Sequence, residues 1–299
     1  MCATPLTYSI ARACRAGALI ALLAGAAPLA GCDGRSQSDE RLAVPNAVRI
    51  ASMSPAITEC LVELGLSDRI VGRTPWCDVS VPDVPVVGTL LDVDAEALVR
   101  ASPTVVLVQP PAQGADPALE ALASRQGWAV RAWPINGLDS ARAAMEGIAT
   151  VVAEADPPRA EEVRARHAQW CAALDDALAP LPEGTARGET VLVMMGGLEG
   201  ISFGRGTYID DALASMGVRN AVERSGYPAL SAEDVVRIAP GTIVVIGGTA
   251  RGKADGTGSL PSRVIRVPAD GLAVPGGRLP HGLKALRDAL VSRGGAGGG

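Results

Sequence analysis

Short apolar runs alternate with longer amphipathic segments along most of this chain. Runs rich in Val, Ile and Met at residues 48–53, 104–108, 190–195 and 242–246 have the length and continuity of strands buried on both faces. The segments between them place apolar residues every three to four positions and end at Gly or Pro, as helices do. Strands that alternate with helices predict parallel sheets covered by helices. We therefore expect an α/β fold.

One unit of this pattern occurs twice. Residues 95–108 and 232–245 both begin with Ala-Glu, continue as a short amphipathic segment that ends at Pro, and finish in a Val-rich run. Each copy is preceded by a strand and a helix that ends at a Gly, at Gly65 and at Gly217. The duplication predicts two similar α/β lobes, each with a central parallel sheet.

A single long helix is expected between the two lobes. Pro157-Pro158 suits a helix start, and the chain then runs to Leu178 without a breaker. One stripe of this segment is formed by Val163, His167, Trp170, Leu174 and Leu178, at three- and four-residue spacing. A helix from Pro158 to Leu178 would be roughly 30 Å long, which is enough to cross a lobe.

The first residues resemble an export signal. Arg12 and Arg15 precede an uncharged apolar run that ends in Leu-Ala-Gly-Cys, and this ending resembles the lipobox of bacterial lipoproteins, in which the cysteine, here Cys32, is acylated. An uncleaved membrane anchor is the alternative, because about 18 apolar residues begin to span a bilayer. Both interpretations place the remaining chain outside the cytoplasm. The expected parts are a lipoprotein signal peptide (1–31), a flexible tether (32–46), an N-terminal lobe (47–136), a helical connector (137–186), a C-terminal lobe (187–293) and a flexible tail (294–299).

Composition excludes several classes of function. A net charge of −5 is unsuited to a nucleic-acid partner. The chain has only two histidines, His167 and His281, so a bare-metal site built from several histidines is not expected, nor is a resident cofactor. Cys60, Cys77 and Cys171 remain after export, and either a Cys60–Cys77 disulfide or three free thiols is compatible with the compartment.

Residues 47–292 resemble the class III periplasmic binding proteins, the vitamin B12, ferric-siderophore and haem receptors of ABC importers. The most specific part is the stretch from Ser52-Met53-Ser54-Pro55 to Gly72. The resemblance implies two rigid lobes that face each other across a shallow cleft and are joined by one helix. It also implies that Glu96 and Glu233, the acidic residues of the repeat, dock on an ABC permease dimer through its arginines. The alternative is two ordinary glutamates at helix starts.

The resemblance also places candidate ligand contacts at strand ends that face the cleft. Aromatic residues are scarce, with four Trp, three Tyr and one Phe, and planar side chains suit a flat macrocycle or a catecholate complex. For each candidate the alternative is a packing or turn role. The predicted ligand contacts are Trp76, Tyr227, Phe203, Tyr208, Arg73, Arg205, Asp270 and Arg278.

The function expected from these features is capture of a metal chelate for import. The chain would be an extracytoplasmic, lipid-anchored monomer that is not an enzyme, and its ligand a ferric siderophore, haem or a corrinoid. Leu90, Ile201 and Gly271 stand where the vitamin B12 receptors carry aromatics, which weakens the corrinoid alternative. A sensory or scaffolding lipoprotein of the same fold is the main alternative. An exported hydrolase would need a base, and the two histidines have no recognisable partner pattern.

Overall fold

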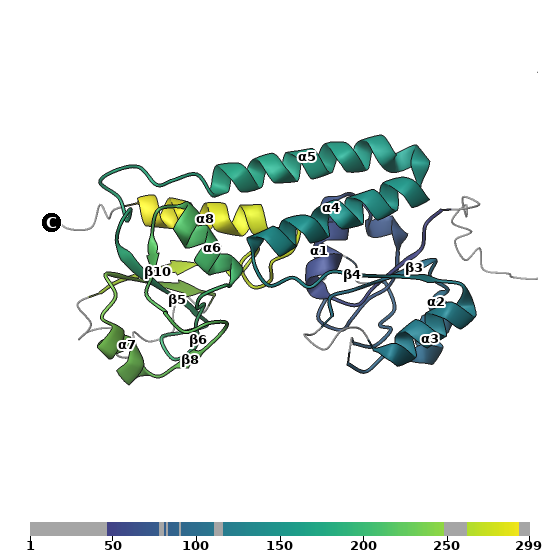
Figure 1. Ribbon diagram of the computed structural model, residues 1–299, viewed down its shortest axis with the longest axis horizontal. Helices are drawn as coiled ribbons and strands as arrows, with labels where there is room; N and C mark the ends of the chain where they lie inside the picture. The colour runs from purple at the N-terminus through teal and green to yellow at the C-terminus, as the bar shows by residue number, and fades with distance from the viewer. Residues whose placement is uncertain are drawn as a thin grey trace, which may run out of the picture. The chain divides into compact units, whose positions relative to one another are not determined.

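The fold is described from a computed structural model (Figure 1). Cys32 and the segments expected to be a signal peptide, a tether and a tail lie outside the described residues. By its internal contacts, the chain from Val44 onward forms one compact unit. The residues that the structure describes are 47–77, 81, 83–89, 91–110, 116–247 and 262–292.

The N-terminal lobe is built on a parallel four-stranded sheet with the order β2-β1-β3-β4. Its two central strands are buried along their whole length, as their continuous apolar sequence predicts, and Ile50 of β1 pairs with Val105 of β3. Helix α1 begins at Pro55. Proline is tolerated in the first turn of a helix, because the backbone N–H groups there have no partner within the helix. The elements of this lobe are β1 (Ile50–Ser52), α1 (Pro55–Glu63), β2 (Ile70–Gly72), α2 (Ala95–Ala101), β3 (Val105–Val108), α3 (Pro117–Gln126) and β4 (Ala129–Ala132).

The C-terminal lobe repeats this plan with a parallel sheet of order β10-β9-β5-β7. A two-stranded antiparallel ribbon of β6 and β8 is added to it, and the sequence pattern did not predict this ribbon. The elements are β5 (Thr190–Met195), β6 (Gly200–Ile201), α6 (Tyr208–Ser215), β7 (Arg219–Asn220), β8 (Ala229–Leu230), α7 (Ala232–Ile238), β9 (Thr242–Ile246), β10 (Arg263–Val267) and α8 (Leu279–Val291). The α/β fold with parallel sheets is confirmed.

The connector contains two long helices, α4 (Leu138–Ala155) and α5 (Ala160–Ala177). The expected helix is α5, and Pro157–Arg159 forms a 3-10 turn just before it. Of the predicted stripe, Val163, Trp170 and Leu174 are buried, whereas His167 and Leu178 are half-buried. In Figure 1, α5 runs alongside both α4 and α8, and both pairs of helices are in contact.

The internal repeat is confirmed as a structural repeat of α2–β3 and α7–β9. Each helix has a side-chain N-cap, from Asp94 in the first copy and from Ser231 in the second. Each also ends on a residue other than glycine in the left-handed conformation, Ser102 with φ 46° and Ala239 with φ 45°. The two lobes therefore share cap geometry as well as element order.

The three cysteines of the described chain are free thiols, which decides against the Cys60–Cys77 disulfide. Cys77 instead accepts a hydrogen bond from Thr58 Oγ1 at 2.9 Å. Burial raises the pKa of the Cys60 thiol, and the carboxylates of Glu59 and Glu63 raise it further. Within the described part of the chain, no helix combines the length and the apolar character needed to cross a membrane.

Candidate ligand-binding surfaces of the two lobes

Trp76 lies at the tip of a turn that follows strand β2. The Cys77 N–H closes this turn on the Thr74 carbonyl at 3.2 Å, with Pro75 in the position that favours proline. The turn is tied to α1, because Thr58 Oγ1 donates to Cys77 Sγ. The Trp76 side chain projects from this fixed turn and is 70% exposed. A large apolar ring held in solvent on a fixed turn is suited to contact a ligand.

Apolar side chains accompany Trp76 on the same loop region. Val86 and Leu91 are both exposed, and Val86 forms an isolated bridge with Arg73. The Arg73 guanidinium donates to the carbonyls of Val84 and Thr74 at 3.0 and 3.2 Å. Arg73 therefore shapes the loop that presents Trp76, and its predicted ligand contact stays a prediction.

Three of the four candidate aromatics meet in the C-terminal lobe. The Phe203 ring lies 5.6 Å from Tyr208 and 5.7 Å from Tyr227, edge to face in both cases. Only Tyr227 reaches the surface, at 50% exposed, while Phe203 and Tyr208 are buried. Tyr208 Oη donates to the Leu272 carbonyl at 2.6 Å. The buried Phe203 thus packs against Tyr227 on one edge and against Tyr208 on another. A direct ligand contact by Phe203 or Tyr208 stays untested.

Arg205 lies beside Tyr227 on neighbouring chain segments. The Arg205 N–H donates to the Arg224 carbonyl, and the Gly226 N–H donates back to the Arg205 carbonyl. The Arg205 side chain is exposed, with Glu223 at 3.8 Å as a long ion pair. The predicted surface of this lobe therefore combines one aromatic ring with a cation that is only weakly engaged.

The structure joins two predicted contacts, Asp270 and Arg278, in an ion pair of 2.9 Å. Arg278 also reaches Glu59 of α1 at 3.0 Å, so its guanidinium connects the two lobes. Sequence reasoning missed Glu59, because α1 carries two glutamates, Glu59 and Glu63, and nothing in the sequence shows that only Glu59 is buried. Ligand contact by Asp270 and Arg278 stays a prediction, and both already have protein partners.

The two glutamates of the repeat occupy matching exposed positions. Glu96 lies in the first turn of α2 and Glu233 in the first turn of α7, and both side chains are exposed. Glu96 is paired within its own helix to Arg100 at 2.5 Å. Both carboxylates can therefore meet a partner protein without rearrangement of the fold.

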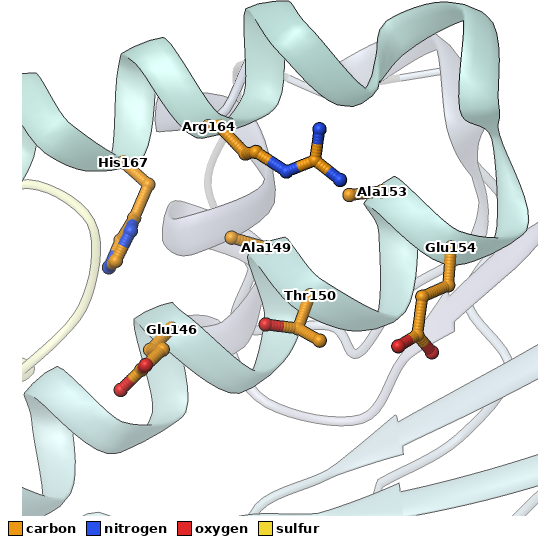
Figure 2. Close-up of a pocket in the computed structure, with 7 residues that line it drawn as sticks. All are labelled: Glu146, Ala149, Thr150, Ala153, Glu154, Arg164 and His167. Carbon is orange, nitrogen blue, oxygen red and sulfur yellow. The ribbon is translucent and has the colours of Figure 1, made fainter.

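The two connector helices line a pocket of about 260 Å³. Its lining side chains, shown in Figure 2, come from Glu146, Ala149, Thr150, Ala153 and Glu154 of α4 and from Arg164 and His167 of α5. Its volume is below the roughly 300–1,000 Å³ typical of sites for larger ligands. No predicted ligand contact lines this pocket, and the described residues contain no group of three metal-ligating side chains.

Residues 200–204 read Gly-Ile-Ser-Phe-Gly and so match the Gly-x-Ser-x-Gly pattern of serine hydrolases. That pattern needs a sharp strand-to-helix turn that exposes the serine. Ser202 instead follows β6 in the antiparallel ribbon, is buried, and donates its hydroxyl to the Pro228 carbonyl at 2.7 Å. This serine is a structural residue, and the hydrolase alternative gains no support from it.

The family of the chain is decided by its sequence match over most of the folded region. Residues 50–269 match the family model described as periplasmic binding protein. The chain belongs to this family. This periplasmic binding protein is therefore an extracytoplasmic binding protein and not an enzyme, and its resemblance to the class III receptors is confirmed.

Solved structures share the fold of this periplasmic binding protein along nearly their whole length. The haem-binding protein BhuT, in complex with two haems, is 25% identical with a TM-score of 0.64, over 81% of this chain and 97% of BhuT. The vitamin B12-binding protein BtuF of Vibrio cholerae is 18% identical with a TM-score of 0.64, over 82% and 97%. A possible iron-binding protein from Staphylococcus epidermidis is 20% identical with a TM-score of 0.63, over 82% and 98%. Among curated protein sequences, none matches this chain.

Proposed function

We propose that this protein is the substrate-binding lipoprotein of an ABC importer and captures a metal chelate between its two lobes. The observation that carries the proposal is one exposed aromatic on each lobe, Trp76 and Tyr227, each held from behind by fixed structure. Two rings presented by separate lobes suit a ligand with two broad faces. The cargo class is therefore a haem, a corrinoid or a ferric siderophore with aromatic groups.

The positive charge of Arg205 favours ligands that carry carboxylates. Arg205 is exposed beside Tyr227, and a guanidinium binds carboxylates through paired hydrogen bonds. Haem carries two propionates, and many siderophores carry carboxylates or catecholates. Solved relatives of the same fold are described as haem-binding and vitamin B12-binding proteins. We place haem first among the candidate cargoes, because it joins a flat apolar ring to carboxylates that Arg205 can bind.

A fluorescence titration tests this function. The chain that begins at Asp33 is titrated with haem, cobalamin and several ferric siderophores while tryptophan emission is followed. One ligand is expected to bind at micromolar concentration or below. Trp76→Ala is expected to weaken its binding about tenfold, since the lost ring contact is worth roughly 1–2 kcal/mol.

Conservative variants control this titration. Trp76→Phe keeps a planar ring and should retain most of the affinity. Tyr227→Phe keeps the ring and removes only the hydroxyl, so it distinguishes the contribution of one from that of the other. Equal affinity of wild type and Trp76→Ala for the bound cargo would place the site elsewhere. Absence of binding across the whole panel would favour a sensory or scaffolding lipoprotein of the same fold.

Membrane attachment through Cys32 is the second part of the proposal. The residues before Cys32 resemble a lipobox, and a lipid-anchored receptor stays close to its permease. The protein is proposed to act as a monomer on the permease dimer. Mass spectrometry of the mature N-terminal peptide should show an acylated Cys32, and a mature chain that starts elsewhere or carries no lipid would contradict the anchor.

A further inference from the structure

The segment that precedes helix α8 lies directly against helix α1 of the other lobe. A Cβ atom at Gly276 would lie 2.5 Å from Glu59 Oε2 and 2.9 Å from the Ala56 carbonyl oxygen. A Cβ atom at Gly277 would overlap the Glu59 carbonyl group. Only glycine allows this approach of two backbones, so the C-terminal lobe is fitted to α1 at this point.

A buried charge fixes the same contact. The Glu59 side chain is 8% exposed, and its Oε1 lies 3.0 Å from Arg278 Nη2. The Arg278 side chain is 40% exposed and also binds Asp270 through Nη1 at 2.9 Å. Only the Glu59 carboxylate is buried, and Arg278 compensates its charge as long as the two lobes stay in contact at this point.

Helix α5 holds the segment from a third direction. The buried Trp170 indole N–H donates to the Gly277 carbonyl at 2.7 Å. Glu59, Trp170 and the Gly276–Arg278 segment thus meet at one place, which we call the lobe junction. Each of its three parts comes from a different region of the fold: α1, the connector, and the start of α8.

A second fastening lies at the beginning of α4. Asp211 of α6 accepts a hydrogen bond from the Leu138 N–H at 2.9 Å, and so caps the connector helix from the C-terminal lobe. Two separate attachments restrict rotation of one lobe against the other far more than one does. These two attachments therefore act together on the orientation of the lobes.

We propose that Glu59 and Arg278 are a positioning pair that holds the two lobes in the orientation in which both aromatic surfaces meet one ligand. The expected change in cargo affinity rests on the function proposed above. The expected change in the distance between the lobes does not. If release of the pair leaves the binding orientation populated for about a tenth of the time, the apparent dissociation constant rises about tenfold.

The test measures the distance between the lobes directly. Spin labels are placed on exposed helix positions by Ser124→Cys and Ala214→Cys, with Cys32→Ser and Cys171→Ser, in the chain that begins at residue 32. Pulsed electron resonance should give one narrow distance distribution for wild type and a clearly broader one for Glu59→Gln. Glu63→Gln, an exposed glutamate one turn further along α1, is the matched control and should leave the distribution narrow.

Affinity and a second variant complete the test. The cargo identified by titration should bind Glu59→Gln about tenfold more weakly and Glu63→Gln as wild type. Trp170→Phe removes the hydrogen bond to Gly277 but keeps an aromatic ring at this buried position, and it should also broaden the distribution, so the proposal stays testable if Glu59→Gln does not fold. Narrow distributions in both variants would overturn it, whereas broad distributions in a chain that binds no cargo would overturn only the proposed function.

Discussion

At the scale of single residues, the two left-handed helix ends give a direct prediction. The left-handed conformation costs a residue other than glycine roughly 1–2 kcal/mol of folding free energy. Replacement by glycine removes this strain, but glycine loses about 0.5–1 kcal/mol more conformational entropy on folding than alanine does. Ala239→Gly is therefore expected to stabilise the protein by up to about 1 kcal/mol. The measurement is the midpoint of urea unfolding, which should rise.

Ser102 provides the comparison for this prediction. Its hydroxyl donates to the Val99 carbonyl at 3.0 Å, so Ser102→Gly loses a hydrogen bond while it relieves the same backbone strain. The expected net change is close to zero. Ala239→Val should lower the midpoint, because a β-branched residue tolerates this conformation poorly. A lower midpoint for Ala239→Gly would show that the strain at this position is compensated elsewhere.

The sequence pointed to the aromatic residues of the candidate surfaces but not to which of them are exposed. Trp76 and Tyr227 were predicted as ligand contacts, and both lie at the surface. Phe203 and Tyr208 were predicted in the same way, but both are buried, and the Tyr208 hydroxyl donates to the Leu272 carbonyl. The Arg278–Glu59 contact joins residues 219 positions apart, and no local pattern indicates such a pair.

At the scale of elements, strong patterns predicted strands and helices well and short pairings poorly. The strands β3 and β5 match the predicted runs 104–108 and 190–195 to within one residue, and α5 matches the helix predicted from Pro158 to Leu178 to within two, because each has a clear pattern and a clear end. Strands β2, β6 and β8 have only two or three residues each. Their existence depends on partners elsewhere in the chain, which sequence pattern does not reveal.

The repeat was the most informative feature at this scale. It predicted two lobes because a matching strand and helix precede each copy, so that each half of the chain contains the elements of its own α/β unit. The structure confirms the copies down to their caps and C-terminal turns. What the repeat did not predict is the lobe junction, since the glycines and Arg278 that form it belong to the second lobe alone.

At the scale of the whole molecule, the matched positions of Glu96 and Glu233 provide the last prediction. An importer permease with two equivalent halves can bind one carboxylate with each half, and a desolvated arginine–carboxylate contact is worth roughly 2–5 kcal/mol when one partner is removed. The double variant Glu96→Gln/Glu233→Gln should therefore lower cargo uptake by cells by well over tenfold. Each single variant should have a smaller effect, and the dissociation constant for cargo should not change.

A third exposed glutamate separates docking from helix stabilisation. Glu120 lies in the first turn of α3, where its charge favours the helix start as those of Glu96 and Glu233 do, but it belongs to no repeat. Glu120→Gln should therefore share any small loss of stability and leave uptake unchanged. Wild-type uptake by the double variant would exclude these two residues from docking. Lost uptake with unchanged affinity would show that the duplicated acidic positions serve the partner, while the aromatic surfaces serve the ligand.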